Sequence, residues 1–122
     1  MSTTNDDTLV NLKCVPCHGG VSALSPADAQ KMLERLLAGG ASAAGWKLVE
    51  DGKALAREFK FPDFYRAMSF VNAVAHIANV EDHHPDIECG WGYCRLKYQT
   101  HSIGGLHEND FICAAKVNNL QR

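Results

Sequence analysis

Residues 79–110 read NVEDHHPDIECGWGYCRLKYQTHSIGGLHEND, and the arrangement of the rest of the chain depends on this stretch. Pro85 cannot continue a helix, and it biases the backbone of His84 towards an extended shape. The pair His83-His84 is therefore expected at the mouth between a helix end and a strand. Imidazole changes charge near neutral pH, so this pair and His101 are candidates for acid–base chemistry or metal binding.

Upstream of the histidines, residues 62–80 have the pattern of a helix that begins at Pro62 and is buried on most sides. Its polar positions form only a narrow strip. Such a helix needs a sheet and a neighbouring helix, or another subunit, to cover it. The apolar positions are Phe64, Ala67, Met68, Phe70, Val71, Ala73, Val74, Ala75, Ile77, Ala78 and Val80.

Downstream, residues 86–89 and 93–101 are predicted to form two antiparallel strands joined around Gly90-Trp91-Gly92. Side chains alternate along a strand, so His101 would end the second strand on its polar face, where a core histidine is not expected. A last helix is predicted over residues 108–120, with Glu108 and Asp110 in its first turn.

The first half of the chain adds one more helix and one more pair of strands. Ser25-Pro26 has the chemistry of a helix start, with serine as N-cap and proline at the first helical position. Residues 46–50 and 53–60 flank Asp51-Gly52, which suits a two-residue type I′ hairpin turn. The order predicts an α+β domain (α-ββ-α-ββ-α) whose four-stranded antiparallel sheet has three helices packed on one face.

Length and composition restrict the class of protein. The 122 residues favour one domain, expected over residues 25–122 after a loosely packed tail over residues 1–24. A net charge of −2 provides no electrostatic reason to bind nucleic acid, and no apolar run approaches the roughly 20 residues of a membrane span. The polar first thirteen residues do not resemble a secretory signal, so a cytoplasmic location is expected.

The segment Cys14-Val-Pro-Cys17-His18 has the pattern of a c-type haem attachment site. Covalent haem attachment normally follows export, for which no signal is seen. A structural zinc would need a second ligand pair at a suitable spacing, and Cys89 and Cys94 do not provide a good one. A reduced surface pair of thiols is therefore the preferred interpretation.

Four interpretations of the histidines remain open on residue types alone. Adjacent histidines cannot easily both face one metal ion, which disfavours a metal site. A nucleophilic site would need an activated serine or cysteine, and no nucleophile elbow is present. Structural histidines, common in His-Pro turns, and a metal-free acid–base site are the other two possibilities.

The combination of these residues resembles the pterin-4a-carbinolamine dehydratase family, and its bacterial branch in particular. The resemblance covers residue 22 to the C-terminus. Two positions depart from the family pattern: Asn79 stands where many members carry a charge, and His107 stands where a serine often caps the last helix. The matching residues are His83-His84-Pro85, Trp91, Thr100-His101, Ile103-Gly104-Gly105-Leu106 and Asn109-Asp110-Phe111.

The resemblance implies dehydration of 4a-hydroxytetrahydrobiopterin, or a bacterial pterin analogue, to the quinonoid dihydropterin. It implies His83, His84 and His101 as catalytic residues, with His84 the most important, and no metal or cofactor. It also implies a homodimer or homotetramer and a functional link to an aromatic amino acid hydroxylase. The substrate-binding residues expected on this basis are Trp46, Asn79, Asp82, Pro85, Thr100 and Asp110.

Relatives of this fold also act as binding proteins, either as a transcriptional dimerisation cofactor or as assembly factors for carbon-fixing enzymes. A non-catalytic binding module therefore stays open as the alternative. Retention of all three histidines favours catalysis, because a pure binding module needs none of them.

Overall fold

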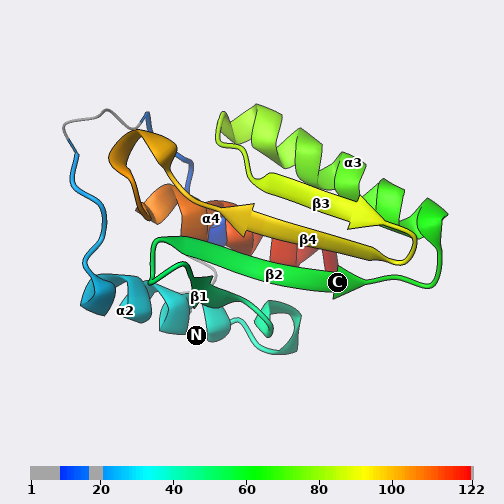
Figure 1. Ribbon diagram of the computed structural model, residues 1–122, viewed down its shortest axis with the longest axis horizontal. Helices are drawn as coiled ribbons and strands as arrows, with labels where there is room; N and C mark the ends of the chain where they lie inside the picture. The colour runs from blue at the N-terminus through cyan, green and yellow to red at the C-terminus, as the bar shows by residue number, and fades with distance from the viewer. Residues whose placement is uncertain (1–8, 17–20, 122) are drawn as a thin grey trace.

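The computed structural model describes residues 9–16 and 21–121, which form an α+β arrangement around one sheet (Figure 1). The order of long helices and strands is the expected α-ββ-α-ββ-α. Residues 9–11 are also helical. The elements are α2 (Pro26–Leu37), η1 (Ala41–Ala43), β1 (Lys47–Val49), β2 (Ala54–Lys60), α3 (Phe64–Glu81), β3 (Asp86–Gly90), β4 (Tyr93–Tyr98), η2 (His101–Ile103), α4 (Glu108–Asn118) and η3 (Asn119–Gln121), where η marks a 3₁₀ helix.

The four strands pair antiparallel in the order β1-β2-β4-β3, which confirms the predicted sheet. Strands β2 and β4 are central, and their register places Leu55 opposite Tyr98 and Phe59 opposite Cys94. These four side chains are buried on one face of the sheet. Apolar side chains of α2, α3 and α4 join them in a single core, so the three helices cover that face.

Helix α2 begins as the sequence predicts. Ser25 is the N-cap and its Oγ accepts a hydrogen bond from the Asp28 N–H (3.1 Å), while proline occupies the first helical position. Helix α3 begins slightly later than expected: Asp63 is its N-cap, and Oδ1 accepts from the Arg66 N–H (2.9 Å). Pro62 therefore precedes the helix and does not open it.

The turn between β1 and β2 is centred on Asp51-Gly52, as predicted. Val49 pairs with Ala54, which is the register that a two-residue turn at these positions sets, and the Lys53 N–H donates to the Glu50 carbonyl (3.1 Å). Asp51 (φ 58°) and Gly52 (φ 81°) both have the positive φ that a type I′ turn requires. Glu50 (φ 54°) is left-handed as well, so the strand pairing stops at Val49 and Ala54 and residues 50–53 form the loop.

The expectation of a loosely packed N-terminal tail is wrong for the residues described there. Leu9 is fully buried in the core, and the Lys116 ammonium donates to the Val10 carbonyl (2.8 Å). Val15 and the Asn109 side chain exchange two hydrogen bonds of 3.0 and 2.7 Å. A stretch that is mostly polar in sequence is thus fastened to α4. Cys17 and His18 lie outside the described residues.

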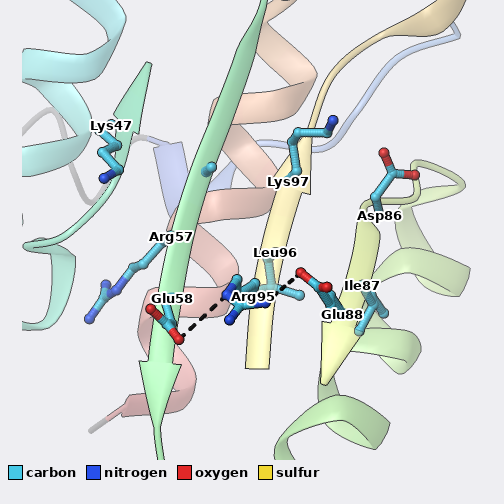
Figure 2. Close-up of a pocket in the computed structure, with 10 residues that line it drawn as sticks. Lys47, Arg57, Glu58, Asp86, Ile87, Glu88, Arg95, Leu96 and Lys97 are labelled. Carbon is cyan, nitrogen blue, oxygen red and sulfur yellow. Dashed lines mark hydrogen bonds and ion pairs between the residues drawn. The ribbon is translucent and has the colours of Figure 1, made fainter. Parts of the chain in front are cut away.

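In residues 9–16 and 21–121, no helix covers the opposite face of the sheet, which forms a depression of about 410 Å³ (Figure 2). Its polar lining is largely made of paired charges: Arg95 contacts Glu88 at 2.6 Å and Glu58 at 3.5 Å. None of the described histidines lines this depression, so they provide it with no acid–base group of the kind singled out in the sequence.

Among the described residues, no helix combines the length and apolar character that crossing a membrane requires.

Candidate active site

A second cavity, of about 650 Å³, brings the three predicted histidines together. It lies where the end of α3, the loop after β4, the start of α4 and the N-terminal segment meet. His83, His84 and His101 all contribute to its lining, although the sheet hairpin separates the first two from the third. The other lining residues are Cys14, Val15, Pro16, Val80, Glu81, Asp82, Gln99, Thr100, Ser102 and Asn109.

The end of α3 positions the histidine pair. Asp82 is the C-cap in a left-handed conformation (φ 53°), and the His83 N–H donates to the Ala78 carbonyl (3.2 Å). Pro85 then prevents further helix, and β3 begins at Asp86. His83 is largely buried, with 12% of its side chain exposed, whereas His84 is exposed. The chain reversal thus presents two neighbouring imidazoles in different surroundings.

His101 does not end a strand, as the sequence suggested. Strand β4 stops at Tyr98, and His101 is the first residue of the 3₁₀ helix η2. Thr100 and Gly105 form an isolated bridge, with the Thr100 N–H donating to the Gly105 carbonyl (2.8 Å). Gly104, at φ 69°, completes this tight loop, which turns His101 towards the cavity formed with His83 and His84.

Asp110 is a buried carboxylate that holds His83, Thr100 and the start of α4 together. Its side chain is fully buried, and Oδ1 lies 2.6 Å from His83 Nε2. Oδ2 accepts hydrogen bonds from Thr100 Oγ1 (2.8 Å) and from the His107 N–H (3.0 Å). An ionised carboxylate can only accept hydrogen bonds, so with Asp110 ionised the His83 Nε2–H donates to Oδ1 and Nδ1 is the other available nitrogen.

Asp110 also supports the last helix, in addition to holding His83. Asp110 is the third residue of α4, and its bond to the His107 N–H is half of a capping box. His107 supplies the other half, because its Nδ1 accepts from the Asn109 N–H (3.0 Å). Histidine thus replaces the expected serine cap without losing the cap.

Tyr98 closes the core beneath the site. Its ring lies parallel to the His83 imidazole, with 6.2 Å between centroids and 6° between planes. Burial, followed by the nearby Cys113, raises the pKa of the Tyr98 hydroxyl well above its usual range. Tyr98 therefore stays neutral beside His83 and does not act as a base there.

Trp46 is not brought to this cavity. Its side chain is 3% exposed and packs against Phe59 and Tyr98, each with ring centroids 6.1 Å away. Its Nε1–H donates to Asn118 Oδ1 (2.6 Å). A ring enclosed in this way cannot serve as a platform for a ligand, so the expected substrate-binding role of Trp46 needs correction: it is a core residue.

The other predicted substrate-binding residues separate into two groups. Asp82 and Thr100 line the cavity, and Asp110 reaches it through His83. Asn79 is exposed on α3 and Pro85 is half-buried, and neither belongs to the cavity lining. Trp91 lies in the turn between β3 and β4 and is 72% exposed.

Sequence reasoning missed two polar side chains of the site, those of Glu81 and Asn109. Glu81, whose side chain is 6% exposed, accepts a hydrogen bond from the Cys14 N–H (2.8 Å) and lies 3.7 Å from the Lys116 ammonium. Asn109 fastens Val15, as described above. The position of Glu81 beside the histidine pair was a usable signal, but nothing in the sequence indicated that residues 14–16 would form a wall of the cavity.

The described residues contain no group of three or more His, Cys, Asp or Glu side chains placed to hold a metal ion. What they do contain is one imidazole held by a buried carboxylate and two exposed imidazoles around a common cavity. Within the described part of the chain, no hydrogen bond holds the imidazole of His84 or that of His101, so both side chains can turn towards a ligand. The arrangement suits proton transfer to and from a small molecule.

Fold and cavity together define an α+β protein with a histidine-lined cavity at one end of its sheet hairpin. The family model described as "Pterin 4 alpha carbinolamine dehydratase" matches residues 22–120. The chain belongs to this family, as its sequence motifs suggested.

Similar proteins support the same assignment. A protein of Nitrosomonas europaea named "Putative pterin-4-alpha-carbinolamine dehydratase" is 47% identical over 117 residues, covering 96% of each chain. A protein of the same name from Halorhodospira halophila is 47% identical over 113 residues, 93% of this chain and 97% of the relative. These relatives extend over nearly the whole chain, so the likeness includes the N-terminal segment that closes the cavity.

Two solved structures share the fold. The crystal structure of a transcriptional coactivator/pterin dehydratase from Brucella melitensis is 30% identical, with a TM-score of 0.71, and covers 81% of this chain and 98% of that one. A pterin dehydratase-like protein identified as a RuBisCO assembly factor in the alpha-carboxysome is 21% identical. Its TM-score is 0.56 over 65% of this chain and 92% of that one, which shows likeness of fold alone.

Proposed function

We propose that the protein dehydrates a pterin-4a-carbinolamine, 4a-hydroxytetrahydrobiopterin or a bacterial analogue, to the quinonoid dihydropterin. The observation that carries this proposal is the meeting of His83, His84 and His101 in one cavity of about 650 Å³. That volume falls within the range of roughly 300–1,000 Å³ usual for small-molecule sites. After a separate enzyme has reduced the quinonoid product by two electrons, the tetrahydropterin would again serve the aromatic amino acid hydroxylase that forms the carbinolamine.

The reaction needs two proton transfers and no change of oxidation state. A base takes the proton from N5 while an acid protonates the 4a-hydroxyl. The C4a–O bond breaks, the C4a=N5 double bond forms, and water leaves. Imidazoles that change charge near neutral pH can serve as both acid and base.

The surroundings of the three histidines support different parts in this scheme. The buried Asp110 carboxylate holds His83 in one orientation and leaves Nδ1 as the nitrogen for proton exchange. His84 and His101 are exposed and approach the cavity from different loops, so they can address the two sides of a flat ring. We assign His84 the largest share of the proton transfer, with His83 and His101 as partners. Asp82 and Thr100 belong to the substrate-binding wall, and Asn79 and Pro85 support it from outside the lining.

The test is the decay of the carbinolamine followed by absorbance. Wild-type protein is expected to accelerate decay above the buffer rate, and His84→Ala to lower the enzymatic rate by roughly 100-fold, the usual contribution of one acid–base group. His76→Ala is the matched control, because His76 is an exposed histidine of α3 outside this cavity. It should retain the wild-type rate.

The same assay separates catalysis from the alternative, a non-catalytic binding module. Exposed apolar side chains on α3 favour some protein contact, since Phe64 and Tyr65 are 51% and 78% exposed. A wild-type protein without effect on carbinolamine decay, at concentrations where it is folded, would favour the binding module and contradict the dehydratase proposal.

We further propose that these α3 side chains contact a second copy of the chain in a homodimer or homotetramer. Sedimentation of the wild-type protein is expected to give a multiple of the 13.3 kDa chain mass. Tyr65→Glu should shift it towards the monomer, because a charge in an apolar interface is costly to desolvate. Lys53→Glu, in the exposed β1–β2 loop, should leave the mass unchanged. A monomeric wild type would contradict the proposal.

A further inference from the structure

Two cysteine thiols meet beside the candidate active site. Cys14 Sγ lies 3.5 Å from Cys113 Sγ, although the residues are 99 positions apart in sequence. Cys14 is half-buried and lines the cavity, whereas Cys113 is fully buried in α4. The proposed dehydration uses neither thiol, so this contact between the N-terminal segment and α4 has no part in the chemistry described above.

We propose that Cys14 and Cys113 form a redox-sensitive pair, whose oxidation by a peroxide to a disulfide ties residues 14–16 covalently to α4. The resting state is the dithiol. The disulfide fixes one wall of the histidine cavity in place and makes release of that wall depend on a reductant.

The geometry favours closure of this bond. A disulfide has an S–S distance of about 2.05 Å, so the sulfurs must approach from 3.5 Å. Cys113 is held by its helix, but residues 12–16 lie outside helices and strands and can make the small movement. Cys14 is also the accessible member of the pair, because it faces the cavity through which a small peroxide can enter.

The chemistry balances without a metal or another cofactor. Cys14 sulfur attacks one peroxide oxygen, the O–O bond breaks, and a sulfenic acid and water result. Cys113 sulfur then attacks Cys14 sulfur, the S–O bond breaks, and the hydroxyl leaves as water with the Cys113 proton. The hydrogen bond that the Cys113 thiol makes to Cys14, followed by burial, raises the pKa of the Cys113 thiol far above its usual range, which suits Cys113 as the second and not the first thiol to react.

Hydrogen bonds around Cys14 explain why a disulfide between Cys14 and Cys113 would hold one wall of the histidine cavity more firmly. The Cys14 N–H is held by Glu81 at 2.8 Å, and the next residue, Val15, is held by Asn109. In the dithiol only non-covalent contacts fasten residues 14–16, these hydrogen bonds among them, and such contacts can open locally. In the disulfide a loop of about 100 residues is closed, which restricts the unfolded chain and opposes that opening.

The experiment treats the full-length, pre-reduced protein with hydrogen peroxide, blocks remaining thiols by alkylation, and maps disulfides by peptide mass spectrometry. The Cys14–Cys113 cross-link is expected as the main product, within one chain and reversed by dithiothreitol. Oxidised protein should melt at least about 5 °C higher than reduced protein. The shift should be absent in Cys14→Ser, which changes only the half-buried partner and spares the core.

Control variants address two of the three remaining cysteines; the third, Cys94, is fully buried in the core. Cys17→Ser and Cys89→Ser should both retain the cross-link and the melting shift. The proposal would be overturned by a main product that joins Cys14 to Cys17 or by a cross-link between chains. It would also be overturned if the Cys14 and Cys113 thiols resisted peroxide. Stoichiometric zinc that protects Cys14 and Cys113 from alkylation would overturn it as well. None of these outcomes depends on dehydratase activity, so the redox proposal and the proposed function can fail separately.

Discussion

An Asp110→Asn variant is expected to fold but to lose roughly 100-fold or more of its carbinolamine dehydration rate. The amide oxygen can still accept from Thr100 Oγ1 and from the His107 N–H, so the cap of α4 survives. The amide NH₂ then faces His83 Nε2 and forces the ring proton onto Nδ1. His83 would then present an N–H donor at Nδ1, where the reaction needs an acceptor. In other enzymes a histidine held in the wrong tautomer lowers the catalytic rate strongly.

The measurement pairs the rate with urea unfolding. Asp110→Asn should lower the free energy of unfolding by only about 1–2 kcal/mol, because most of its hydrogen bonds are replaced. Asp110→Ala leaves the buried hydroxyl and N–H donors unpaired and should cost about 3–5 kcal/mol. Asp28→Asn, at the exposed start of α2, is the control for loss of one carboxylate. An asparagine variant with the full wild-type rate would contradict the orienting role of Asp110.

Trp46→Ala is expected to lower the free energy of unfolding by about 3–5 kcal/mol, as large-to-small changes of buried tryptophan do. The indole fills the space between Phe59 and Tyr98, and its N–H bonds Asn118 Oδ1, which also accepts from Arg57 Nη1 (3.0 Å). Denaturant unfolding measures the loss. Trp46→Phe keeps an aromatic ring in the core and should cost about 1–2 kcal/mol for the lost hydrogen bond.

Trp91 provides the matched control, since it is a tryptophan 72% exposed in the β3–β4 turn. Trp91→Ala should change the free energy of unfolding by no more than about 0.5 kcal/mol. If Trp46→Phe left stability intact while pterin binding fell strongly, Trp46 would be a ligand platform after all and its assignment to the core would be wrong.

Local interactions explain why much of the fold could be predicted from sequence. A serine N-cap followed by proline begins α2 through atoms within three residues, and alternation places Cys94, Leu96 and Tyr98 on the core face of β4. The β1–β2 turn was predictable for the same reason, because Asp51 and Gly52 tolerate positive φ and the bond from the Lys53 N–H to the Glu50 carbonyl is local. The register that this turn sets also keeps Leu55 in the core, since moving it by one residue would turn Leu55 away.

The site was predictable where one residue acts on its neighbours. Pro85 ends the helix in any tertiary context, so the placing of His83 and His84 at a helix end followed from sequence. The spacing of the matching residues from His83 to Asp110 was also sufficient to recognise the family from the sequence alone. By contrast, the end of β4 at Tyr98 and the 3₁₀ turn at His101 depend on the bridge between Thr100 and Gly105, which alternation alone does not reveal.

The sequence by itself thus determined the order of helices and strands, the family, and the histidines around which the cavity forms. Only the tertiary structure decided that Trp46 is enclosed in the core and that residues 14–16 close the cavity. The contact between Cys14 and Glu81 spans 67 positions and that between Cys14 and Cys113 spans 99. Interactions at such separations leave no periodic or local signal, because they exist only after the core has brought α3, α4 and the N-terminal segment together.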